Sequence, residues 1–249
     1  TEALKGEVNR ASKVEIVAGG AIVALLASAG AASAQVRHRA TVELRPGLVI
    51  TRSTRVAPGT YRLPAPASLD SAVVVVRGDN ITVDFSGATM EGTDPDADPD
   101  RAAGVAIRVE GGRNVRILHA RVRGYQVGIL ARDTRGLDLL DLDVSYNWKP
   151  RLFSVVEHES LVDWLSFHHN EHDEWLRYGA AIYLAGVRGG TIRGIRAEQG
   201  MNGLLLVRTD SVRVLDNSFS FNSGLGIGLY RSSDNTLMRN LVRYDVRGY

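Results

Sequence analysis

Short runs in which apolar and polar residues alternate recur along most of the chain. Ile107-Arg108-Val109 and Val115-Arg116-Ile117 are typical, and a period of two is the pattern of a β-strand with one buried face. Pro-Gly pairs and Gly, Asn or Asp residues separate the runs, and these residues favour tight turns. The pattern therefore predicts many short strands rather than helices.

The turns repeat at a nearly constant interval. Aligned turn positions fall at Asn80, Asn114, Gly136, Gly190, Ser211 and Asn235, in steps of 34, 22, 54, 21 and 24 residues. The two long steps reduce to 22 if 12 and 32 residues are inserted. A period near 22 with two or three short strands is typical of a parallel β-helix, in which each coil buries its apolar side against the next. A leucine-rich repeat is the competing solenoid, but no coil shows its leucine-rich strand followed by a helical turn.

Alternation also predicts which side chains point into the core. The expected core residues are Ile107, Val109, Ile117, Ile129, Ile182, Leu184, Val212, Val214, Ile227 and Leu229.

Glycine-led strands, a turn Asn and a second Asn after the next strand (Asn217, Asn240) resemble the secreted right-handed parallel β-helix proteins, which include pectate lyases, polygalacturonases and alginate epimerases. The resemblance covers residues 40–249. It implies an all-β fold, a single-stranded right-handed solenoid, with a polysaccharide along an outer sheet face. The catalytic signatures of those enzymes (Asn-Thr-Asp with Asp-Asp and Gly-His-Gly, or Asp-Pro-His-Asp) do not occur here, so no catalytic residue is carried over.

Residues 1–34 have the pattern of a secretory leader. A basic start is followed by an uncharged run from Ile16 to Ala34, and Ala32-Ser33-Ala34 fits a cleavage site before Gln35. A membrane anchor is the alternative, although the Ala and Gly content makes the run weakly hydrophobic. We expect a secreted or periplasmic monomer with one β-helix domain over 35–249, an N-terminal cap over 35–70 and a truncated C-terminus.

Composition narrows the function classes. The net charge of +2 gives no indication of a basic surface that would bind nucleic acids. The chain has no cysteine, which excludes disulfides, thiolate metal sites and a cysteine nucleophile. Arginine is frequent, and Lys149 is the one lysine after residue 34. Arginine suits bidentate binding of carboxylates, although most charges are simply solvated surface.

The first insertion is an acidic loop over residues 92–101, in which Asp94, Asp96, Asp98 and Asp100 alternate with other residues. Carboxylates at this density can bind calcium, so calcium is the candidate cofactor. The loop lacks the central glycine and terminal glutamate of an EF-hand, so a solvated acidic loop is the simpler interpretation.

The second insertion spans residues 148–178 and contains Phe167-His168-His169-Asn170-Glu171-His172-Asp173-Glu174-Trp175. Three of the six histidines lie in this stretch. Helical spacing relates Leu161, Trp164, Leu165, His168, His172, Trp175 and Leu176. We expect a short helix or a structured loop packed on the flank of the β-helix.

Four interpretations of this stretch remain open. His168-x-x-Glu171-His172 matches a zinc-protease motif, but the motif needs a protease fold. Histidine with carboxylates is also a general acid–base set. The aromatic residues could stack on sugar rings without catalysis. Finally, the aromatic residues could pack on the coils while the charged groups lie in water or pair with Arg177 and Arg151.

The prediction is an exported β-helix protein that acts on an acidic polysaccharide, as a lyase or epimerase ahead of a glycoside hydrolase; a non-catalytic glycan-binding or cell-surface protein is the alternative. The predicted catalytic residues are His168, His169, Glu171, His172, Asp173, Glu174 and Tyr183, with no metal assigned. The predicted substrate-binding residues are Trp148, Trp164, Trp175, Arg177 and Tyr178. Once the leader is removed, we expect no membrane or nucleic-acid partner.

Overall fold

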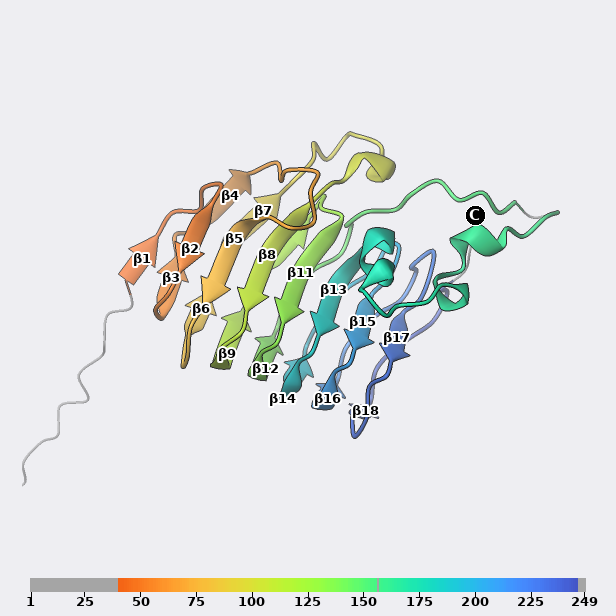
Figure 1. The fold of residues 1–249 in the computed structure, drawn as a ribbon. Coiled ribbons are helices and arrows are strands. Elements are labelled where there is room, and N and C mark those ends of the chain that lie inside the picture. Colours follow the sequence, from red (N-terminus) through yellow and green to blue (C-terminus); the bar gives the residue numbers. More distant parts are fainter. Residues whose placement is uncertain (1–39, 156, 246–249) are drawn as a thin grey trace, which may run out of the picture. The chain divides into compact units, whose positions relative to one another are not determined.

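The computed structural model describes residues 40–155 and 157–245, and these wind through three parallel sheets (Figure 1). Sheet 1 consists of β2 (Leu48–Ile50), β5 (Ala72–Arg77), β8 (Val105–Glu110), β11 (Val127–Arg132), β13 (Ala180–Ala185), β15 (Leu204–Val207) and β17 (Ile227–Tyr230). Sheet 2 consists of β1 (Ala40–Val42), β3 (Thr54–Val56), β6 (Thr82–Asp84), β9 (Arg113–Leu118), β12 (Arg135–Leu140), β14 (Arg188–Arg193), β16 (Asp210–Leu215) and β18 (Thr236–Met238). Sheet 3 consists of β4 (Gly59–Arg62), β7 (Ala88–Glu91) and β10 (Arg121–Arg123).

Beyond β10, sheet 3 continues as isolated β-bridges, each between one residue of a coil and one residue of the next. Arg121 pairs with Asp143, Asp143 with Arg196, and Arg196 with Ser218. Each coil therefore visits sheets 1, 2 and 3 in turn, as the 22-residue period predicts. The expected N-terminal cap supplies strands to all three sheets through β2, β3 and β4, and thus forms a coil of its own.

The core is built from columns of equivalent side chains. In sheet 1, Ile107, Ile129, Ile182 and Leu204 are paired in register, and all are fully buried. Sheet 2 has an equivalent column through Ile117, Leu139, Ile192 and Val214. Eight of the ten predicted core residues are buried. The exceptions lie in β17, where Ile227 is half-buried and Leu229 is 42% exposed in the last coil described.

The turn between sheets 1 and 2 has a left-handed residue in each coil. Positive φ values occur at Asn80, Asn114, Gly136, Gly189, Ser211 and Asp234. Gly190 also has a positive φ, but the strand register aligns Gly189 with Gly136 and Asp234 with Ser211, so the predicted positions Gly190 and Asn235 are each wrong by one residue. Gly190 is a strand residue paired with Leu137, and a Cβ there would lie 2.0 Å from the Leu137 carbonyl oxygen.

Buried asparagines bind the other turns to the coils. The Asn217 amide donates to the Ile192 carbonyl at 3.1 Å and to Asn240 Oδ1 at 2.8 Å, and Asn217 Oδ1 accepts the Ile195 amide at 2.9 Å. Asn217 thereby links three consecutive coils. This ladder explains why an asparagine recurs after the second strand of the repeat.

The insertions contain short 3₁₀ turns. Within the described residues they hold no α-helix: η1 (Pro99–Arg101) lies in the first, and η2 (Leu161–Asp163), η3 (Leu165–Phe167) and η4 (Glu174–Tyr178) lie in the second. Of the two predicted forms for residues 148–178, the structured loop is the one observed. No helix in the described residues is long and apolar enough to cross a membrane. The predicted leader and its cleavage site lie outside the described residues.

Replacing Leu206 by Ala should destabilise the fold by about 2–5 kcal/mol, because its fully buried side chain leaves a cavity between coils. Urea denaturation measures the change. Leu161→Ala is the control, since Leu161 is 56% exposed on the insertion. Equal losses in the two variants would contradict the core assignment.

Candidate functional site

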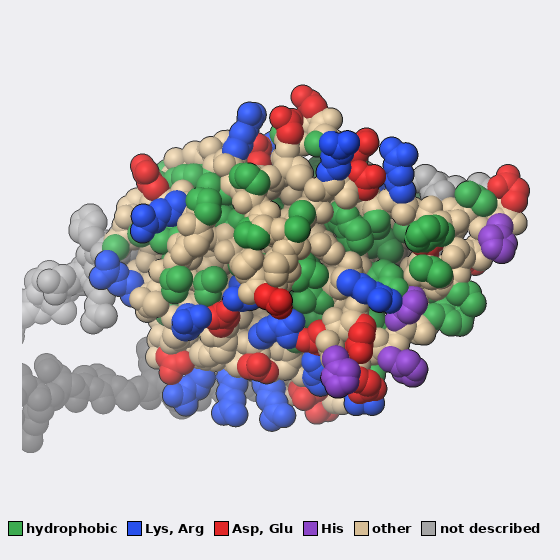
Figure 2. All heavy atoms as spheres, turned by 45° about the horizontal axis from the view of Figure 1, so that its top comes forward, with side chains coloured by type: hydrophobic (Ala, Val, Ile, Leu, Met, Phe, Trp, Pro, Cys, Tyr) green, Lys and Arg blue, Asp and Glu red, His purple; other side chains and the backbone are tan. Residues whose placement is uncertain are grey.

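The second insertion covers the outer face of sheet 1. Leu165, Trp175 and Leu176 are buried against a surface that includes Tyr183 and Leu205, both with no exposed area. The insertion covers the surface above Tyr183 and Leu205, so no groove is open to a ligand there in the described residues. Figure 2 shows the histidines gathered at one end of the molecular face, among carboxylates and arginines.

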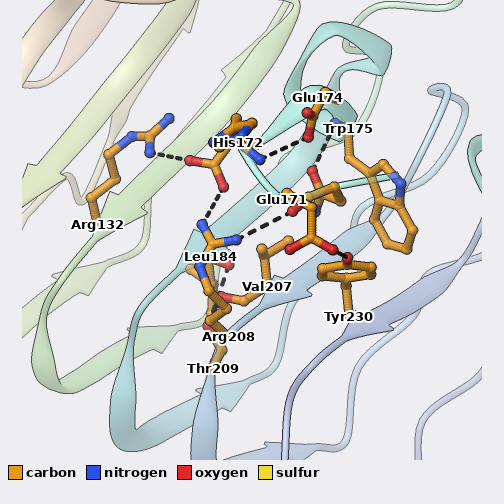
Figure 3. A network of polar contacts seen from close by, with 12 residues as sticks. Arg132, Glu171, His172, Glu174, Trp175, Leu184, Val207, Arg208, Thr209 and Tyr230 are labelled. Carbon is orange, nitrogen blue, oxygen red and sulfur yellow. Dashed lines mark hydrogen bonds and ion pairs between the residues drawn. The ribbon is translucent and has the colours of Figure 1, made fainter. Parts of the chain in front are cut away.

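Asp173 anchors the insertion to the coils. Its carboxylate accepts hydrogen bonds from Arg132 at the end of β11 and from Arg208 after β15 (Figure 3). Burial raises the pKa of Asp173, but the two guanidinium groups outweigh it and hold that pKa below its usual value. Asp173 is therefore an ionised anchor between two coils. It also has a left-handed backbone conformation, with φ of 63°.

Glu171 and Glu174 are also held within the protein. Glu171 Oε1 accepts a hydrogen bond from the Tyr230 hydroxyl at 2.7 Å (Figure 3). It also accepts one from Arg231 at 2.7 Å. Glu174 accepts the His172 amide at 2.9 Å, and this backbone bond lowers the pKa of Glu174. The three predicted carboxylates thus bind different partners and do not converge on one reacting position.

His168 supports the shape of the loop. Its Nε2 lies 3.1 Å from the Val162 carbonyl, and its own carbonyl accepts the Trp175 indole N–H at 2.9 Å. Arg177 lies over the Tyr178 ring at 4.9 Å and donates to the Tyr178 hydroxyl at 2.9 Å. These residues hold one another in place. His169 and His172 are exposed, and their rings make no hydrogen bond to any residue that the structure describes.

The remaining predicted aromatic residues pack within the protein. Trp175 is buried and meets Tyr230 edge-on at 5.2 Å, and Trp164 meets Phe167 at 6.1 Å. The Trp148 indole donates to the Asp100 carbonyl at 3.0 Å, which joins the base of this insertion to the acidic loop.

Tyr183 points outward from β13 but lies beneath the loop. Burial and the neighbouring Asp173 raise its pKa, so its hydroxyl stays neutral. Tyr183 has no access to an external ligand while the insertion is in place.

A second cluster of polar residues lies on sheet 3, in a groove of about 910 Å³ that runs across several coils. We call it the sheet 3 groove. Its lining residues include Thr60, Ser86, Thr89, Glu91, His119, Arg121, Arg123, Asp141, Asp143, Ser145, Tyr146 and Arg196. No residue predicted from the sequence as part of the site lines this groove.

His119 has the environment of an acid–base group. It occupies the left-handed turn after β9, and its Nδ1 lies 3.0 Å from Asp84 Oδ1 and 3.0 Å from Ser86 Oγ. Burial raises the pKa of Asp84, but hydrogen bonds from Ser86 and His119 outweigh it, and the pKa falls below the usual value. An ionised Asp84 accepts a hydrogen bond from the Nδ1–H group of a neutral His119, and in that tautomer Nε2 is free to act as an acceptor. Ser86 shares Nδ1 with Asp84, so the three residues are not arranged as a serine nucleophile with its base.

Charged groups surround His119 in the groove. Asp141 occupies the same turn position one coil later, about 4.8 Å along the axis. Gly194 follows one coil beyond, and a Cβ there would lie 2.3 Å from Asp141 Oδ1. Arg196 pairs with Asp143, and Arg123 donates to the buried Glu91 at 3.1 Å. Arg121 is exposed and makes no ion pair with the described residues.

The sequence matches the family model described as the right-handed beta helix region over residues 103–245, more than half of the chain. The chain belongs to the right-handed β-helix family. No curated protein and no solved structure matches it. Family membership therefore confirms the predicted fold and leaves the activity to be argued from the residues.

The acidic loop gives no metal site among the residues described. Arg151 approaches Asp98 at 3.5 Å and Asp100 at 3.4 Å, and Asp94 accepts the Asp96 amide at 3.0 Å. No three His, Asp or Glu side chains in the described residues are placed to hold one ion.

The sequence contained a signal for His119 that was missed. Asp84 ends the preceding strand of sheet 2 and pairs with Leu118, one residue before His119. A histidine at the turn position after a sheet 2 strand, with a carboxylate one coil earlier, is recognisable once the register is known.

Asp173→Asn should release the insertion from sheet 1. Asn tolerates the left-handed backbone, so the variant removes the charge and little else. The folded pKa of Asp173 lies below the 3.8 of the free side chain, so its stabilisation is complete above pH 3.8 and is lost as the pH falls through the folded pKa. All three tryptophans lie in residues 148–178. Their fluorescence in an acid titration should show the release in the parent protein, and at neutral pH already in the variant.

Asp216→Asn is the control for this titration. Asp216 also has a pKa lowered by an arginine, Arg239, but it lies at a turn outside the insertion. An identical acid titration for Asp173→Asn and the parent protein would show that Asp173 does not anchor the loop.

Proposed function

We propose that the protein binds an acidic polysaccharide in the sheet 3 groove and acts on it as a lyase or an epimerase. The observation that carries the proposal is His119, held by Asp84 in a groove that also presents Arg121 and Arg196. The groove runs along the stacked coils, as an extended polymer requires. Membership of the β-helix family supports a polysaccharide ligand and does not select the reaction.

The chemistry follows from these groups. Elimination and epimerisation of a uronate both begin with removal of the proton next to its carboxylate. His119 Nε2 is the base, and Asp84 stabilises the imidazolium that forms. Arg121 offsets the negative charge that develops on the uronate carboxylate. In an elimination a carbon–carbon double bond forms as the bond to the leaving glycosidic oxygen breaks, and that oxygen takes a proton from the imidazolium or from water. In an epimerisation water supplies the proton that adds to the opposite face.

His119→Gln should lower kcat by about 10²–10⁴ on a uronate polymer, since it removes the base from an otherwise unchanged groove. Ultraviolet absorbance of unsaturated ends measures elimination, and proton NMR of the polymer measures epimerisation. Asp84→Asn should lower kcat with little change in KM, because it removes the group that fixes the imidazole tautomer. Ser86→Ala is the control and should retain most of the activity.

The same assays separate the two candidate sites. If His169→Ala and His172→Ala abolish turnover while His119→Gln does not, the reaction belongs to the insertion. Polymer binding without turnover on galacturonate, mannuronate or guluronate polymers would leave a glycan-binding protein and contradict the proposed catalysis.

A further inference from the structure

A column of exposed aromatic residues begins at Tyr146, which lines the sheet 3 groove, and continues into the later coils. The turn that leaves sheet 3 has a left-handed residue three positions after each bridge residue, at Gly124, Tyr146, Gln199, Phe221 and Tyr244. Backbone bonds confirm the stacking, since the Gly124 amide donates to the Tyr146 carbonyl and the Tyr146 amide to the Glu198 carbonyl. Equivalent turn positions in successive coils thus form a line parallel to the solenoid axis.

The side chains in this column do not suit their backbone. A left-handed conformation favours Gly, Asn and Asp, and disfavours large side chains. Yet Tyr146, Phe221 and Tyr244 have φ values of 57°, 61° and 57°. The three residues are also exposed, with 59%, 40% and 62% of their surfaces in contact with solvent. Neither backbone preference nor burial explains an aromatic residue at these turns.

Tyr146 is the most informative of the three. Phe221 and Tyr244 stack on each other at 5.2 Å, and Arg243 lies over Tyr244 at 5.7 Å, so protein covers one face of the Phe221 ring. Tyr146 stacks on no ring of the described residues, and it lines the groove that contains His119 and Arg196. The left-handed backbone is shared by the whole column, so the feature that indicates a ligand is the exposed Tyr146 ring at the edge of the groove.

We infer that Tyr146 and Phe221 are stacking platforms for the apolar faces of sugar rings, and that the glycan lies along the solenoid axis over at least three coils. The two residues are two coils apart, which is about 10 Å. An aromatic face fits the C–H face of a pyranose, while the arginines of the groove bind its carboxylates. The inference rests on the proposed function, because it specifies how the ligand of that groove is held.

Tyr146→Gly tests the inference because stability and binding should change independently. Glycine relieves the left-handed strain, so the thermal midpoint should stay the same or rise. Binding of a galacturonate or mannuronate hexasaccharide, measured by calorimetry, should weaken by about three- to tenfold, as expected for one aromatic contact. Phe221→Gly should weaken binding as well, and the double variant should lose more than either single one.

Gln199→Gly is the matched control. Gln199 has the same left-handed backbone in the same column, with φ of 62°, but carries no ring. The Gln199→Gly variant should lose the same backbone strain and bind the hexasaccharides with the affinity of the parent protein. If Tyr146→Gly binds the hexasaccharides as tightly as Gln199→Gly, the aromatic residues are not stacking platforms, although the sheet 3 groove can still bind the glycan through its arginines. If the parent protein binds no uronate hexasaccharide, the proposed function fails and the platforms with it.

Discussion

Each coil of this chain buries its apolar side only when the next coil lies directly above it. The register of the parallel ladders is therefore the constraint on which the structure depends: Ile107, Ile129 and Ile182 must be stacked in line, or no core exists. The turn residues are compatible with this register but do not determine it. Asn217, which binds three coils, holds the register at the turns where no ladder does.

The constraint also explains how two long insertions are tolerated. An insertion between coils costs little loop-closure entropy as long as the chain returns in register, and here it re-enters at β13. The second insertion then covers the outer face of sheet 1 with Leu165, Trp175 and Leu176, and Asp173 is held between arginines of two coils. The histidines and carboxylates that the sequence suggested as catalytic residues therefore mainly attach the second insertion to the coils. Sheet 3 remains open to solvent.

The sequence was sufficient for the fold because alternation and period are local signals repeated many times. It predicted the inward residues of β8, β11, β13 and β16 correctly, and it erred by one residue at Gly190, where two adjacent glycines both suit a turn. It could not locate the site, because clustering along the chain differs from clustering in space. His168, Glu171 and Asp173 are close in sequence but bind separate partners, whereas Asp84 and His119 meet only through the stacking of coils.

At equivalent turn positions in successive coils, the fold determines the backbone conformation, whereas function can determine the side chain. The fold requires a left-handed backbone at each turn, and it sets no requirement on a side chain that points into solvent. At the turn after sheet 2 the chain places His119 and Asp141, and at the turn after sheet 3 it places Tyr146 and Phe221. The strands between these two columns present Arg121 and Arg196 outward. Acid–base groups, cations and aromatic faces thereby lie in parallel rows with the spacing of the coils, which is the arrangement that a polymer of repeating charged rings would match.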